Sequence, residues 1–117
     1  MKINNNFNIS SFNNQQGVLA VPSIARNLTT GTIKPTSIIW NWDAPTDDGG
    51  DAIDYYYIRW FLLSDTVNPL GVAAENVLTY ESTALSASTE YFLKVRPHNH
   101  AGLGPTATLS AETNAPL

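Results

Sequence analysis

Cysteine is absent from the sequence, which excludes disulfide bonds, thiol nucleophiles and thiolate metal ligands. Basic residues are few: there are six lysines and arginines against ten aspartates and glutamates, and the net charge of −4 disfavours binding to a phosphate backbone. Long apolar runs are also missing, since no segment approaches the ~20 residues that a membrane-spanning helix needs. The sequence therefore predicts neither a nucleic acid partner nor a membrane span.

The start of the chain also lacks the pattern of a signal peptide. Lys2 is followed by asparagine-rich sequence, and the apolar stretch 18–21 is too short for a signal core. Six asparagines and two glutamines lie within residues 1–16, with too few large apolar side chains to offset the entropy of ordering. We expect a flexible tail over residues 1–20, mobile through residue 16 unless bound, and a linker-like end over residues 114–117.

Short alternating segments, separated by turn-forming residues, begin at residue 21. Segment 37–42 carries an isoleucine and two tryptophans on one face, and similar strand signals occur in segments 53–61, 77–82, 90–96 and 106–113. Residues 43–51 form a turn by composition, and residues 62–76 are expected to be irregular. No window predicts a capped helix. The pattern indicates one all-β domain over residues 21–113, folded as an antiparallel sandwich.

The order of several separate motifs resembles a fibronectin type III domain over residues 21–113. The motifs are Pro22 with Asn27-Leu28 for the first strand, Trp42 three residues before Pro45 in the second, the loop 47–53, the alternating Tyr56, Ile58 and Trp60 of the third strand, the corner from Leu85 to Tyr91, and Val95, Asn99 and 101–105 for the sixth strand and its following loop. The resemblance implies an all-β, seven-stranded antiparallel immunoglobulin-like β-sandwich of fibronectin type III topology. It implies no cofactor.

The same resemblance defines a structural core made of Trp42, Tyr56, Leu85 and Tyr91. Trp42 fills the space between the two sheets, and Tyr91 is positioned to send its hydroxyl back to the backbone of the corner, an arrangement called a tyrosine corner. Three residues depart from the family pattern: Ser82, Ala87 and Pro97. Because Pro97 lacks a backbone donor, we expect a local break or bulge there.

Strand alternation also predicts a surface on one sheet face. If Tyr56 faces the core, its neighbours along the third strand face outward, as do alternate residues of the adjacent sixth strand. This candidate interaction face comprises Tyr55, Tyr57, Arg59, Phe92, Lys94 and Arg96. Two interpretations stay open: a basic, aromatic docking face, or a cross-strand ladder whose long side chains cover the aromatic rings.

Acidic residues and both histidines are predicted to meet at one end of the sandwich. They are Asp43, Asp47, Asp48, Asp51, Asp54, His98 and His100. Such a set can bind a divalent metal, but aspartate and glycine at this density are also ordinary turn formers. We expect solvated turn residues, no metal site and no catalytic group, and we predict that folding requires no metal.

The sequence thus predicts a non-catalytic protein-interaction or spacer module, as in a phage virion or a microbial surface assembly. The resemblance implies an extracellular, cell-surface or virion-associated location and adjacent domains in a longer chain. The expected partner is a protein or a surface glycan. The alternative is a carbohydrate-directed accessory domain of a secreted glycoside hydrolase, in which Tyr55 and Tyr57 stack on sugar rings.

Overall fold

The computed structural model describes residues 18–117, so the predicted mobility of residues 1–16 lies outside the described residues. Eight strands follow one another along the chain: β1 (Arg26–Lys34), β2 (Ser37–Asp43), β3 (Tyr55–Leu62), β4 (Gly71–Glu75), β5 (Thr79–Ser82), β6 (Glu90–Asn99), β7 (Gly102–Leu103) and β8 (Ala107–Glu112). Across this part of the chain there is no helix, and hence none long and apolar enough to cross a membrane.

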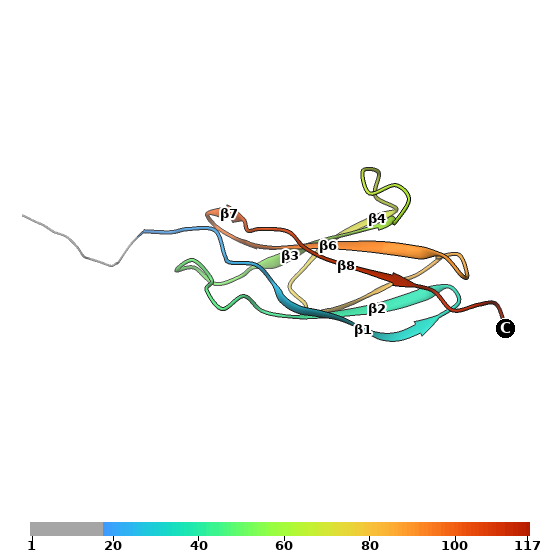
Figure 1. Cartoon of the computed structure of the whole chain (residues 1–117). Coiled ribbons are helices and arrows are strands. Elements are labelled where there is room, and N and C mark those ends of the chain that lie inside the picture. The colour runs from blue at the N-terminus through green and yellow to red at the C-terminus, as the bar shows by residue number, and fades with distance from the viewer. Residues whose placement is uncertain (1–17) are drawn as a thin grey trace, which may run out of the picture.

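Two antiparallel sheets form the layers of a sandwich (Figure 1). One sheet has the order β1-β2-β5, and the other has the order β4-β3-β6 with β7 and β8 both pairing with β6. β1 and β8 lie against each other where the two sheets meet at one side. The predicted all-β antiparallel sandwich is confirmed.

The eight strands exceed the expected seven by one, the two-residue β7. Separately, β4 lies in a region expected to be irregular. β4 is an edge strand that, among the described strands, pairs only with β3. Its first residue, Gly71, lies opposite Trp60, and a Cβ on residue 71 would lie 2.0 Å from Cζ2 of the indole. β4 can therefore pair with β3 at this point because residue 71 is a glycine.

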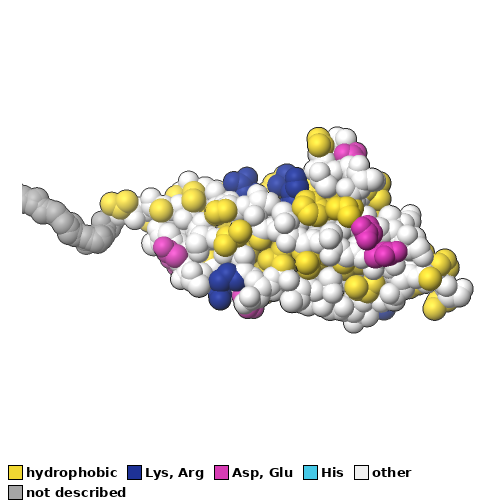
Figure 2. Space-filling view, viewed as in Figure 1, with side chains coloured by type: hydrophobic (Ala, Val, Ile, Leu, Met, Phe, Trp, Pro, Cys, Tyr) yellow, Lys and Arg dark blue, Asp and Glu magenta, His cyan; other side chains and the backbone are white. Residues whose placement is uncertain are grey.

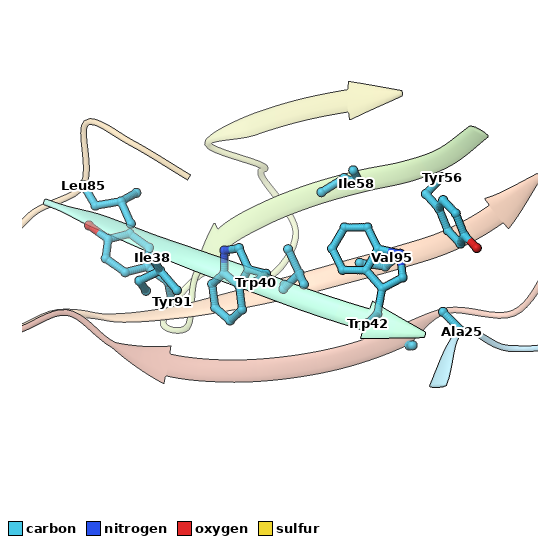
Figure 3. Packing of buried hydrophobic residues seen from close by; sticks show 11 residues of the cluster. Ala25, Ile38, Trp40, Trp42, Tyr56, Ile58, Leu85, Tyr91 and Val95 are labelled. Atoms are coloured by element: carbon cyan, nitrogen blue, oxygen red, sulfur yellow. The ribbon is translucent and has the colours of Figure 1, made fainter. Parts of the chain in front are cut away.

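The core lies between the inward faces of β2, β3 and β6 (Figure 3). The inward row of β2 consists of Ile38, Trp40 and Trp42, all almost fully buried. Trp40 donates a hydrogen bond from Nε1 to the buried Ser82 Oγ, at 3.0 Å. This bond explains the serine at a position that is usually apolar, because the indole needs an acceptor when it is buried.

The expected break at Pro97 does not occur within β6. Pro97 pairs with Tyr56 in an unbroken register along β3. Its carbonyl accepts a hydrogen bond from Gly104 N at 2.8 Å, so the backbone polar groups of Pro97 point away from β3. On that side of β6, β7 has ended at Leu103 and β8 begins only at Ala107. The missing donor therefore faces a gap between two partner strands, and the irregularity lies in the partner rather than in β6.

Leu85 and Tyr91 fasten the chain where it crosses from β5 to β6. The Tyr91 hydroxyl accepts a hydrogen bond from Ser86 N at 2.7 Å, while Leu85 N donates to Thr36 O in the β1–β2 turn at 3.0 Å. Leu85 and Tyr91 are both buried, at 8% and 2% exposure. This geometry is a tyrosine corner, and it links the two sheets through one ring.

The corner yields a stability prediction. Tyr91→Phe removes the acceptor for Ser86 N and leaves the ring in place, so we expect the free energy of unfolding to fall by about 1 kcal/mol, the usual net worth of one hydrogen bond. Urea denaturation measures the change. Tyr80→Phe, which keeps its ring against Trp60, is the control and should change stability by less than about 0.5 kcal/mol. Equal effects of the two variants would contradict this account of the corner.

Candidate functional site

The chain reaches the sandwich through an N-terminal strap, residues 18–25, which crosses the end formed by the β2–β3 loop and the β6–β7 turn. Ala20 N donates to Gly49 O at 3.0 Å, and Ser23 N donates to Asp47 O at 2.8 Å. Gly49 has φ of +82°, and a Cβ on it would lie 1.9 Å from Ala20 O. A glycine is thus required at this loop position both by backbone conformation and by the close approach of the strap.

Asn99, at the end of β6, joins three segments at this end of the molecule. Its Nδ2 donates to Ala20 O at 2.8 Å and to Asp48 O at 2.7 Å, while its Oδ1 accepts from Ala101 N at 2.8 Å. The side chain is fully buried. Asn99 therefore satisfies both donors of its amide and one lone pair, and it binds the strap, the β2–β3 loop and the β6–β7 turn together.

Ala20 and Asn114, which lie just outside the predicted domain of residues 21–113, are both hydrogen-bonded to it. The backbone N–H and carbonyl of Ala20, in the predicted tail, bind the loop at Gly49 and Asn99 Nδ2. Asn114, in the predicted linker-like end, accepts from Ser88 N at 3.0 Å through its carbonyl and donates from Nδ2 to Ile33 O at 2.7 Å. The chain is therefore anchored to the sandwich at both of these residues.

The acidic residues at this end serve local structure. Asp47 and Asp48 each accept from the backbone N–H two residues onward, at 2.8 and 2.9 Å, as in turns built by aspartate side chains. Asp51 Oδ2 accepts from both N and Nδ1 of His100, at 2.8 and 2.9 Å. Asp43 instead accepts from Asn27 Nδ2. The aspartates of the predicted cluster therefore bind different partners and do not converge on one point.

His98 pairs with Asp54 at the start of β3, with 2.7 Å between Nδ1 and Oδ1. The hydrogen bond from His98 holds the pKa of Asp54 below its usual value. Because the folded-state pKa is the lower one, the pair favours the folded state above the unfolded pKa of about 4, and this contribution disappears as the pH falls through the folded pKa. Within residues 18–117 no three histidine or acidic side chains converge as metal ligands.

The candidate interaction face lies where strand alternation predicted it, on the outer face of β3 and β6. Tyr57 is paired with Arg96 and Arg59 with Lys94 across the two strands. All six predicted residues are half-buried rather than fully exposed: Tyr55, Tyr57, Arg59, Phe92, Lys94 and Arg96. Figure 2 shows lysine and arginine side chains beside apolar ones on the upper surface of the molecule.

Contacts within the molecule engage the cations of this face. Lys94 Nζ donates to Thr66 O at 3.1 Å and lies 4.7 Å from the ring centroid of Phe61. Arg96 Nε donates to Gly104 O at 2.8 Å. The Arg59 guanidinium lies 4.8 Å from the ring centroid of Tyr57. These contacts favour the ladder interpretation, in which cations cover aromatic rings and bind loop carbonyls.

Phe61 was missed by the sequence analysis. It belongs to the outer face by alternation, yet it is fully buried, because Lys94 and the β3–β4 loop cover it. The signal was available in the alternation of β3, which places Phe61 two residues after Arg59. What the sequence did not show was that the following loop folds back over the sheet.

One end of the outer face remains aromatic without a covering cation. The Tyr55 and His98 rings are stacked, with centroids 4.2 Å apart and planes inclined by 16°. Asp54 also fixes the imidazole through its hydrogen bond with Nδ1. The two rings therefore form a preorganised aromatic pair beside the β2–β3 loop. The sequence singled out both residues in separate groups, Tyr55 on the outer face and His98 among the acidic residues, and did not predict that their rings stack.

Comparisons with known proteins agree with this architecture. A family model described as fibronectin type III domain matches residues 21–113. Exoglucanase B of Cellulomonas fimi is 30% identical over 97 residues, which cover 81% of this chain but 8% of that protein. A human FNIII domain structure has a TM-score of 0.77 at 21% identity, covering 93% of this chain and 90% of that one. Titin domains A168–A170 have a TM-score of 0.73 at 19% identity, covering 96% and 35%. These two structural likenesses show the fold alone.

The buried hydrogen bonds of Asn99 give a stability prediction for this end of the molecule. Asn99→Ala leaves two carbonyls and one N–H without their buried partner, so the free energy of unfolding should fall by about 2 to 3 kcal/mol. Asn99→Asp should not restore stability, because it turns a carboxylate oxygen toward the same two carbonyls. Denaturation in urea measures both variants. Asn76→Ala, which loses one exposed bond of 3.5 Å, is the control. A loss below about 0.5 kcal/mol for Asn99→Ala would show that the strap is held without this side chain.

Proposed function

Since the chain belongs to the fibronectin type III family, we propose that it is a non-catalytic module that holds neighbouring parts of a longer protein at a fixed separation. Domains of this family are generally non-catalytic. The observation that carries the proposal is the anchoring of both ends of the domain at opposite ends of the sandwich (Figure 1). A spacer must transmit position from one neighbour to the next, and anchored ends do this.

Asn99 and Asn114 have matching roles at the two ends. Asn99 binds the N-terminal strap to two loops at the first end. Asn114 binds the segment after β8 to the β1 strand through Ile33 O and Lys34 O, at 2.7 and 3.3 Å. In each case an asparagine side chain connects the chain terminus to backbone groups of other strands or loops, so that a displacement of the terminus displaces the whole sandwich.

The charged groups support a role without catalysis. In the described residues each histidine is bonded to one aspartate, and both imidazoles use Nδ1 for that bond. A serine or threonine nucleophile activated by histidine needs a third group, a hydroxyl hydrogen-bonded to the other ring nitrogen. Among residues 18–117 no such hydroxyl is hydrogen-bonded to either imidazole. The two pairs are better explained as structural contacts that hold the end of β6 and the β6–β7 turn against the segment before β3.

The context of a longer protein is part of the proposal. The chain spans 8% of the length of Exoglucanase B, and the similar titin structure contains several domains. An extracellular or cell-surface location is the corresponding expectation for this family. The more specific assignment to a phage virion or microbial surface assembly stays a prediction from the sequence, and the match to a bacterial protein is compatible with the microbial part of it.

A distance measurement tests the spacer proposal. Because the chain has no cysteine, Leu19→Cys with Ala115→Cys creates the two thiols that spin labels need. Pulsed dipolar spectroscopy should give one narrow distance distribution. Adding Asn114→Ala removes the side-chain bond to Ile33 O and leaves the two backbone bonds of residue 114, so it should broaden the distribution slightly, whereas adding Asn76→Ala should leave it unchanged. A broad distribution in the protein with native Asn114 would contradict the proposal, because the two ends would then be loosely joined.

Glycan recognition is the second candidate function, favoured by the stacked Tyr55 and His98 rings and by the similarity to a protein named as an exoglucanase. An aromatic pair of this kind offers apolar ring area to the flat face of a sugar, with Asp54 as a nearby acceptor. Titration with soluble gluco-oligosaccharides should then shift the NMR signals of Tyr55 and His98. Tyr55→Ala should abolish the shifts while Leu78→Ala keeps them; no shifts at millimolar sugar would exclude this function.

A further inference from the structure

The two sheets have five edge strands in the described part of the chain, and four of these are protected from pairing with another chain, β7 by its length of two residues. β1 contains two register shifts, between Arg26 and Thr29 and between Thr30 and Ile33. β8 lies against β1, and Asn114 ties the segment after β8 to the same strand. β5 has four residues, including the exposed Glu81. Bulges, covered edges, short strands and edge charges are the devices by which sheets avoid unwanted pairing.

β4 is the exception among the five. Its sequence is Gly-Val-Ala-Ala-Glu, with no lysine, proline or register shift, and it pairs regularly with β3 through all five residues. Its one charge, the exposed Glu75, is the last residue of the strand, whereas Glu81 lies within β5. Val72 is 52% exposed on the outer face, as is Leu70 immediately before the strand. Figure 2 shows apolar side chains gathered at the base of the protruding β3–β4 loop. The edge therefore offers unpaired backbone groups and apolar side chains together.

The β3–β4 loop next to this edge is held in one conformation. Asp65 accepts from the backbone N–H groups of Val67 and Asn68 and from Asn68 Nδ2, at 3.2, 3.3 and 3.0 Å. These bonds, the side-chain bond to Asn68 foremost, hold the pKa of Asp65 below its usual value. Val67, at the same loop, is 80% exposed. Little conformational entropy would be lost here on binding, because the loop is already ordered.

We propose that β4 is a homodimerisation edge, where it pairs antiparallel with β4 of a second copy of the chain. A two-fold axis at Ala73 places Val72 opposite the second copy's Ala74, and Gly71 opposite the second copy's Glu75. The self-complementary register joins the two outer sheets into one continuous sheet, which satisfies the backbone groups of both edges. It also covers Val72 of each copy with an apolar neighbour.

The charges along the β4 edge are compatible with a second copy of β4 as the partner strand. The pairing stretch is neutral apart from Glu75, and the register sets the two glutamates at opposite ends, so no like charges face each other across the new ladder. Of the nearest cations on the outer face, Lys94 is hydrogen-bonded to Thr66 O, and the Arg59 guanidinium lies over the Tyr57 ring with its Nε buried and without an acceptor among the described residues. A partner with a strongly acidic strand would therefore find few free cations here, which favours a neutral partner strand such as β4 itself.

The size of the contact sets its strength. A strand pair of five residues with one adjoining loop falls at the small end of protein interfaces, below roughly 1,200 Å². The dimer should therefore be weak and reversible, forming as concentration rises. It also places two sandwiches side by side, which is distinct from the end-to-end arrangement of the proposed spacer function and does not depend on it.

Sedimentation equilibrium of the full chain tests the proposal. The mean mass should rise from 12.7 kDa toward twice that value as concentration increases. Val72→Lys should weaken association by roughly tenfold or more, about 1.4 kcal/mol, because it places a charge at the paired edge. Ile24→Lys, at an apolar position on the N-terminal strap that is 44% exposed, is the matched control. A monomer at every concentration, or a dimer equally sensitive to both substitutions, overturns the proposal.

A second measurement tests the register and does not depend on the charge variant. Ala73→Cys introduces a single thiol at the proposed two-fold axis, where directly opposed residues lie within the Cα separation that a disulfide spans. Mild oxidation should give a disulfide-linked dimer faster than it does for Ile24→Cys. Equal rates for the two variants would exclude the antiparallel β4 pairing, even if the chain dimerises elsewhere.

Discussion

The inward row of β2 is the constraint on which the sandwich depends, because the chain has no disulfide between its sheets. Trp40 and Trp42 stand between the layers and meet the inward residues of β3 and β6, including Tyr56, whose ring centroid is 5.7 Å from that of Trp42. Burying one such ring stabilises the fold by about 4 to 6 kcal/mol at ~25 cal/mol/Å². Trp42 Nε1 is buried without an acceptor among the described residues, which costs about 1 to 3 kcal/mol. Burial outweighs that cost, so the position tolerates an unpaired donor.

Sequence reasoning succeeded where one physical rule acts alone. Alternation predicted the inward and outward rows of β2, β3 and β6, since burial on one face imposes a period of two. The tyrosine corner followed from the motif between Leu85 and Tyr91. Reasoning failed where two distant segments decide together: Gly71 looks like a strand breaker until Trp60 is seen against it, and Pro97 looks like one until the gap between β7 and β8 is known. Neither contact has a local sequence signal.

For the candidate surfaces too, the sequence predicted which residues lie together but not the contacts that distant segments make with them. The sequence correctly gathered the cations and aromatic rings of the outer face, but their contacts within the fold depend on the β3–β4 loop and on Gly104, which lie far from them in sequence. The acidic residues lie at one end of the molecule, as expected, yet each carboxylate is engaged by a backbone group, an imidazole or, for Asp43, the side-chain amide of Asn27. Charges that bind their own fold have less to offer a partner, since breaking each contact costs free energy before any new one forms.

Because most charged groups are bound within the fold, two parts of the surface remain available for contacts, and they differ in chemistry. The Tyr55–His98 pair offers ring area without strand pairing, at the end where the chain enters the fold. The β4 edge offers backbone groups and apolar side chains along the side. A module anchored at both ends presents its sides to whatever lies beside it in an assembly, so contacts along the side and connections through the ends do not compete. The two proposals are therefore compatible, because a spacer role uses the ends of the sandwich and lateral association uses the β4 edge.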